Sequence, residues 1–153
     1  MLEQPEIVQV PARITAIIRV VVPRAEIRKV MGPGIGELMR TIADQRLKAT
    51  GPWFTRHFSM QAERFDFEIG IPLPTPVRAA GRVEPGELPG GKLARVVHVG
   101  GYDGLPLAWT EFNFWLSSHE HEPKPEHWES YVRGPESDSD PKQWRTELSR
   151  PLH

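Results

Sequence analysis

Hydrophobic positions in the first part of this 153-residue chain follow first the period of a strand and then that of a helix. Residues 6–22 are rich in β-branched side chains and are broken only by Pro11, which predicts one kinked strand or two short ones. Between Gly36 and Lys48 apolar residues recur every three or four positions, as on the buried face of a helix. The run Gly32-Pro33-Gly34 marks the predicted start of that helix.

Two adjacent strands are predicted to close the first half. Gly51 and Pro52 break the chain, and WFTRHFSM follows at residues 53–60. Residues 64–73 then alternate apolar and polar side chains, so one face of the second strand carries Phe65, Phe67, Ile69 and Ile71.

The second half repeats this order. Residues 81–99 predict two strands around the turn Pro89-Gly90-Gly91, and a helix follows from about Asp103 to Ser118, with Asp103 as its N-cap. Strands at 128–134 and 143–152 complete the pattern. Repeats of about 6–75 and 80–152 predict a single α+β domain over residues 1–153, built from duplicated β-α-β-β units. We expect pseudo-twofold symmetry, an antiparallel sheet with two main helices on one face, and a central cleft.

Composition narrows the class of protein. The chain has no cysteine, which excludes disulfides and thiolate zinc sites and suits a cytoplasmic location. Lys and Arg total 19 against 20 Asp and Glu, so no basic surplus favours direct nucleic-acid binding. Neither a basic leader nor an apolar run of about 18 residues is present, so we predict no membrane span. No cofactor motif is apparent, and the Gly32–Gly36 run lacks the Lys-Ser/Thr of a phosphate loop.

Several short motifs in the second half occur in a characteristic order. They are Val97-His98-Val99-Gly100, Gly101-Tyr102, Trp109 with Trp115, Glu129-Ser130-Tyr131, and Arg145-Thr146-Glu147 before Pro151. This order resembles the GyrI-like small-molecule-binding domain, named after a gyrase inhibitor and found as the effector domain of multidrug-responsive transcription activators. Two departures are Gly101, where the family often has proline, and the first-half residues Trp53, Thr55 and His57, where it usually has tyrosines. Because the chain begins at the first strand, the resemblance implies a stand-alone form.

Glu129 is the leading candidate for the site. In a strand it shares a face with His127 and Tyr131, while Trp128 and Val132 face the other way. A carboxylate among aromatic rings attracts a cation, and the resemblance places the ligand-facing glutamate here. The alternative is a structural ion pair with Arg145 or Arg133.

Aromatic residues supply the other candidate walls. Trp109 is the best helical candidate, with Phe112 on the same side and Trp115 assigned to packing. The duplication aligns Trp53 and His57 with the Glu129 strand, which predicts an opposite wall. Ordinary core packing is the alternative for all of these residues.

Three functions stay open at this point. The first is binding of a hydrophobic small molecule, for which Glu129 favours a cationic centre. The second is hydrolysis of cyclopropane-type or other electrophilic xenobiotics, which the resemblance implies for some members, with Glu129 as general base and Tyr131 as proton relay. The third is a gyrase-inhibitor-like interaction module, whose protein partner would be gyrase or a transcription regulator. Binding is preferred, because no nucleophile-base pair is evident. The histidines at 119, 121 and 127 lie on or beside a proline-containing loop, so no metal site is predicted.

Overall fold

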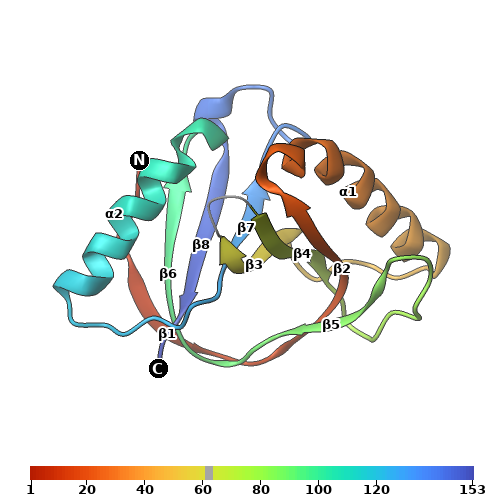
Figure 1. Cartoon of the computed structure of the whole chain (residues 1–153), viewed down its shortest axis with the longest axis horizontal. Helices are drawn as coiled ribbons and strands as arrows, with labels where there is room; N and C mark the ends of the chain where they lie inside the picture. Colours follow the sequence, from red (N-terminus) through yellow and green to blue (C-terminus); the bar gives the residue numbers. More distant parts are fainter. Residues whose placement is uncertain (61–63) are drawn as a thin grey trace. The chain divides into compact units, whose positions relative to one another are not determined.

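The computed structural model describes residues 1–60 and 64–153, and within these ranges the chain forms eight strands and two α-helices (Figure 1). Two compact units divide the chain. One contains residues 1–10 and 91–153, and the other contains residues 11–90. Within both units neighbouring strands pair antiparallel, so the protein is α+β with antiparallel sheet structure, as predicted.

The unit of residues 11–90 is a four-stranded sheet covered by one helix. Its strands are β2 (Arg13–Pro23), β3 (Phe54–Met60), β4 (Arg64–Pro72) and β5 (Glu84–Leu88), in the spatial order β3-β4-β2-β5. Helix α1 (Ile27–Asp44) follows a 3₁₀ turn at Arg24–Glu26 and contacts β2 and β4. The apolar face predicted for β4 is confirmed, because Phe67, Ile69 and Ile71 are buried and Phe65 packs against the same core.

Helix α1 begins earlier than predicted. Gly32, Pro33 and Gly34 lie inside the helix, so the predicted start at these residues and the predicted span 36–48 are wrong. Gly34 serves packing, because a Cβ there would lie 2.7 Å from Cδ1 of Ile69 on β4. Glycine and proline are local helix breakers, but here the close approach of helix and sheet outweighs that preference.

The second unit has the same kind of architecture. Its strands are β1 (Glu6–Val10), β6 (Gly91–Val99), β7 (His127–Arg133) and β8 (Arg145–Pro151), in the order β1-β6-β8-β7. Helix α2 (Leu105–Ser118) lies beside these strands (Figure 1) and shares their core. That core consists of Ala94, Val96, Leu105, Ala108, Phe112, Leu116, Leu148 and Leu152.

The start of α2 also differs from prediction. Asp103 lies in a 3₁₀ turn, Tyr102–Gly104, and is not the N-cap. Gly104 occupies that position without a side-chain cap, and Pro106 stands in the first turn. Proline is well suited to the first turn, since the N–H that it lacks has no partner within the helix there.

The predicted strand at residues 6–22 is two strands that separate at Pro11 and pair in different units. β1 pairs with β6, with Glu6 opposite Arg95, whereas β2 pairs with β4 and β5. The first strand therefore belongs to the same compact unit as residues 91–153. The repeat boundaries 6–75 and 80–152 and the single domain over residues 1–153 stay predictions. Pseudo-twofold symmetry and a central cleft stay predictions. No helix in the described ranges has both the length and the apolar character needed to cross a bilayer.

Candidate ligand-binding site

Strand β7 places Glu129 and Tyr131 on one face, as the two-residue alternation predicts. The Tyr131 hydroxyl donates a hydrogen bond to Oε1 of Glu129 at 2.7 Å. Tyr131 is buried and Glu129 is half-buried. The register of β7 against β8 shifts after Tyr131, so the strand is irregular just beyond this pair.

Helix α2 supplies the second hydrogen bond to the carboxylate. Nε1 of Trp109 donates to Oε2 of Glu129 at 2.6 Å. The indole contacts two further rings, that of His127 in a T-shaped arrangement at a centroid distance of 4.7 Å and that of Phe112 at 5.9 Å. Each carboxylate oxygen of Glu129 therefore accepts one hydrogen bond from a neutral donor.

Glu129 forms no ion pair with any residue that the structure describes. Its two predicted alternative partners are engaged elsewhere: Arg145 contacts Glu3 at 3.0 Å and Arg133 contacts Asp138 at 3.3 Å. The structural ion pair proposed for Glu129 is therefore wrong. A carboxylate held only by neutral donors keeps its negative charge uncompensated within the unit, and its remaining lone pairs can accept further donors.

Two aromatic residues that were not among the predicted site residues extend the site. Tyr102 packs edge-on against Tyr131 at 5.6 Å and contacts Trp144 at 4.9 Å. Burial, followed by the negative charges of Glu136 and Glu129, raises the pKa of Tyr102. The only sequence signal for Tyr102 was its place in the motif Gly101-Tyr102, and Trp144 had none.

The Tyr102 hydroxyl is buried and has no hydrogen-bond partner among the described residues. It approaches the chain closely at Gly134, where a Cβ would lie 2.5 Å from the hydroxyl oxygen. A buried hydroxyl without a partner is costly, so a ligand acceptor at this point would be favourable.

His127 is electrically neutral near pH 7. Burial, reinforced by the positive charge of Arg150, lowers its pKa to about 4. His119 and His121 stack instead on Trp115, at 4.3 and 5.6 Å. The three histidines thus have separate environments, and the described residues form no cluster of three or more metal-ligating side chains.

The remaining predicted site residues occupy packed positions. Phe112 is completely buried in the core beneath Trp109, so it supports the indole. Trp115 packs against the same core, as predicted. Trp53 and His57 belong to the other unit, where His57 stacks on Phe67 at 5.1 Å and Trp53 packs on the core. Their proposed role as an opposite wall stays a prediction.

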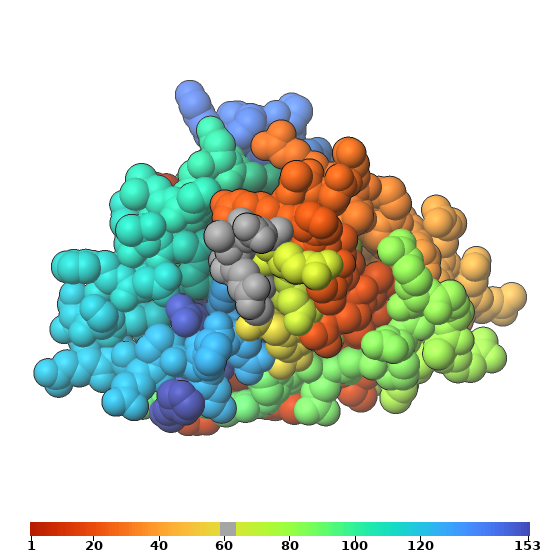
Figure 2. Space-filling model, in the orientation of Figure 1, coloured from red at the N-terminus to blue at the C-terminus, as the bar shows by residue number. Residues whose placement is uncertain are grey.

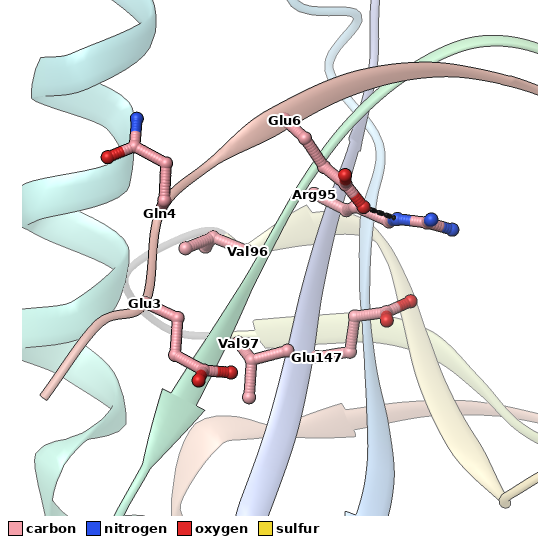
Figure 3. Close-up of a pocket in the computed structure, with 7 residues that line it drawn as sticks. All are labelled: Glu3, Gln4, Glu6, Arg95, Val96, Val97 and Glu147. Atoms are coloured by element: carbon pink, nitrogen blue, oxygen red, sulfur yellow. Dashed lines mark hydrogen bonds and ion pairs between the residues drawn. The ribbon is translucent and has the colours of Figure 1, made fainter.

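A polar pocket of about 360 Å³ lies elsewhere in the unit of residues 1–10 and 91–153 (Figure 3). Its lining residues are Glu3, Gln4, Glu6, Arg95, Val96, Val97 and Glu147. Leu2 pairs with His98 but Glu6 pairs with Arg95, so the register slips by one residue between Leu2 and Glu6. The Glu6–Arg95 ion pair, at 2.6 Å, crosses one side. This pocket contains none of the predicted ligand residues.

Figure 2 shows α2 and the segment that leads into β7 on one face of the molecule. Trp109 lies on α2 and Glu129 on β7 itself, and a hydrogen bond joins them. A carboxylate and several aromatic rings make a site of the kind that proteins use for small molecules. The chain belongs to the GyrI-like small molecule binding domain family, whose profile matches residues 3–153. The protein is thus a small-molecule-binding domain.

Solved structures share the fold. The C-terminal domain of EcmrR is 22% identical with a TM-score of 0.84, and the alignment covers 98% of this chain and 97% of that one. EcmrR in a DNA complex is 23% identical with the same TM-score, and this chain spans 57% of that longer chain. SAV2435 bound to tetraphenylphosphonium is 13% identical with a TM-score of 0.72, covering 99% and 94% of the two chains. No curated protein matches the sequence.

Proposed function

We propose that this domain binds hydrophobic small molecules that carry a positive charge, and that Glu129 balances that charge. The observation that supports the proposal is the half-buried carboxylate whose described partners, Trp109 and Tyr131, are both neutral. A cation beside Glu129 would complete the electrostatics of the site, since partly buried charges are stable when they are paired.

Aromatic rings around the carboxylate support the same ligand class. Trp109, Tyr131 and Tyr102 present π faces and edges within one unit. A cation over such a face gains about 0.5–2 kcal/mol per ring, depending on how much water is excluded. An apolar cation would combine this attraction with burial of its own carbon surface, at about 25 cal/mol per Å².

Tetraphenylphosphonium is a suitable probe, because it is the molecule bound to SAV2435, a protein of the same fold. It has no hydrogen-bond donor, so its affinity reports charge, aromatic contact and apolar burial without a hydrogen bond to the carboxylate. Tryptophan fluorescence would follow its binding to wild-type protein and to Glu129→Gln. We expect the substitution to weaken binding about tenfold or more, equivalent to at least about 1.4 kcal/mol.

A matched control is Glu111→Gln on the exposed side of α2, which removes one negative charge away from the site. We expect its affinity to equal that of wild type. Equal binding by wild type and Glu129→Gln would refute the role of the carboxylate.

A second candidate is hydrolysis of an electrophilic ligand. The observation that favours it is the 2.7 Å hydrogen bond between Tyr131 and Glu129, which joins a base to a proton relay. A structural neighbour described as a hydrolase from Listeria innocua is 13% identical with a TM-score of 0.68. Incubation with an activated cyclopropane or ester, followed by mass spectrometry, tests this function. Conversion no faster than in buffer would exclude it for those substrates.

The proposal extends to how binding is used. We propose a cytoplasmic protein that captures its ligand and acts through a protein partner such as a regulator or gyrase. The near-neutral chain, with 19 basic and 20 acidic residues, supports a partner other than DNA. Affinity capture with and without tetraphenylphosphonium would test this, and a partner retained only in one condition is the expected result. Strong, salt-sensitive DNA binding by the chain alone would contradict it.

A further inference from the structure

Two half-buried side chains of opposite charge, Glu129 on β7 and Arg150 on β8, do not pair with each other. Glu129 lies directly opposite Leu148 across the two strands, so Arg150 is its diagonal neighbour. Diagonal neighbours on a sheet are about 7–8 Å apart at their backbones, within reach of a long side chain. Both residues also contact α2, Glu129 through Trp109 and Arg150 through Asn113. The distance between the two residues therefore does not explain why they form no ion pair.

Neutral acceptors hold the guanidinium instead. Nη1 of Arg150 donates to Oδ1 of Asn113 at 2.8 Å, and Nε donates to the carbonyl oxygen of Lys124 at 3.1 Å. Among the described residues Arg150 has no carboxylate partner. An arginine normally prefers a carboxylate to a neutral oxygen, because the carboxylate adds the attraction of opposite charges and a bidentate geometry to the hydrogen bond.

We propose that Asn113 and the Lys124 carbonyl restrain Arg150, and that this restraint keeps Glu129 available for a ligand cation. Arg150 is then a specificity-determining residue: when released, it would compete with the ligand for the same carboxylate. This inference rests on the proposed function of Glu129 and adds what protects that function from an internal competitor.

His127 is the other potential internal cation near Glu129. It precedes Trp128, which lies opposite Ser149, so His127 is the cross-strand neighbour of Arg150. Burial and the charge of Arg150 together keep the imidazole neutral. Arg150 and His127 are thus both kept from neutralising Glu129, one by restraint and one by loss of charge.

Asn113→Leu tests the inference, because it removes one acceptor from an exposed position and keeps a similar side-chain volume. We expect the affinity for tetraphenylphosphonium to fall about fivefold, as for a partly exposed ion pair formed in competition. Affinity for the neutral triphenylphosphine oxide should be unchanged. In the Arg150→Gln background, the same Asn113→Leu change should have no effect, because no competitor is left. Ser117→Ala, on the exposed side of the same helix, is the control.

A ligand-free readout separates this inference from the proposed function. The indole N–H of Trp109 contacts Glu129, so its NMR signal reports any new partner of the carboxylate. We expect Asn113→Leu to shift this signal and the double variant to restore it. An unshifted signal in Asn113→Leu, or an affinity loss that persists in the Arg150→Gln background, would overturn the inference. If wild type does not bind tetraphenylphosphonium, the proposed function fails and the NMR comparison still decides whether Arg150 is restrained.

Discussion

Nε1 of Trp109 on α2 donates a 2.6 Å hydrogen bond to Oε2 of Glu129 on β7, so an indole and not a cation anchors the carboxylate. The contact joins two residues that are 20 positions apart in the chain. It orients the side chain of Glu129 without neutralising it, and it places an aromatic ring beside the charge. The same geometry would therefore both prepare the carboxylate for a ligand cation and supply a surface for that ligand.

Trp109→Phe should destabilise the fold by about 1–2 kcal/mol more than Trp115→Phe. Both changes remove the same atoms from half-buried rings on α2, but only Trp109 donates to a charged acceptor. Loss of a hydrogen bond to a charged group typically costs about 1.5–3 kcal/mol, and partial access of water to Glu129 reduces that figure. Urea denaturation of the two variants measures the difference. Equal losses would show that the hydrogen bond adds nothing to packing.

The free energy of unfolding should decrease as the pH is lowered from about 6.5 to about 4, because His127 has a lowered pKa in the folded protein. Its pKa in the folded protein is about 4, below the ordinary value of 6.5, so the unfolded chain binds the proton first as the pH falls. The contribution of His127 to the free energy of unfolding is fully present above about pH 6.5. It decreases as the pH falls toward 4 and does not change further below that value. The total change is on the order of 3 kcal/mol.

Comparison with His127→Gln isolates this effect from the carboxylates that titrate nearby. The variant lacks the ionisable ring, so the difference in unfolding free energy between wild type and variant should change over the same pH window. An NMR titration of the His127 ring should give a midpoint near pH 4. A midpoint at the ordinary histidine value would contradict the buried environment described for this ring.

Gly70→Ala should strongly destabilise the unit of residues 11–90. Gly70 is buried on β4 directly opposite Phe54, and a Cβ there would meet ring atoms of Phe54, including Cε2 at 2.8 Å. Overpacking of this kind costs about 1–3 kcal/mol or more. Gly36→Ala is the matched control, because its Cβ would meet only Arg40 Nη1 at 3.5 Å and alanine favours the helix by about 1 kcal/mol. Similar thermal unfolding of both variants would contradict the close contact at Gly70.

Side-chain period predicted most of the elements because it reflects burial within each strand or helix. It identified the apolar face of β4 and placed Glu129 beside Tyr131 on β7. It failed where a distant contact outweighs a local preference. Gly34 lies inside α1, where the missing Cβ lets Ile69 approach, and the chain on either side of Pro11 pairs in different units.

The candidate site, like the fold, was predicted from the sequence only in part. Alternation and the motif order indicated Glu129, Tyr131 and Trp109, which the structure connects by hydrogen bonds. Neither Arg150 nor Asn113 carried a sequence signal, because their role depends on which acceptor the guanidinium reaches across α2 and β8. Periodicity assigns a face to each residue but does not choose its hydrogen-bond partner.

The most direct test of the central claim is an NMR titration with tetraphenylphosphonium that follows the indole N–H signals. Trp109→Phe assigns the signal of Trp109 among the five tryptophans of the chain. We expect the Trp109 signal to shift and saturate with the added cation in wild type, and to respond only at much higher concentration in Glu129→Gln. Saturable binding that leaves the Trp109 signal unmoved, or that is identical in Glu129→Gln, would contradict a cation site at Glu129.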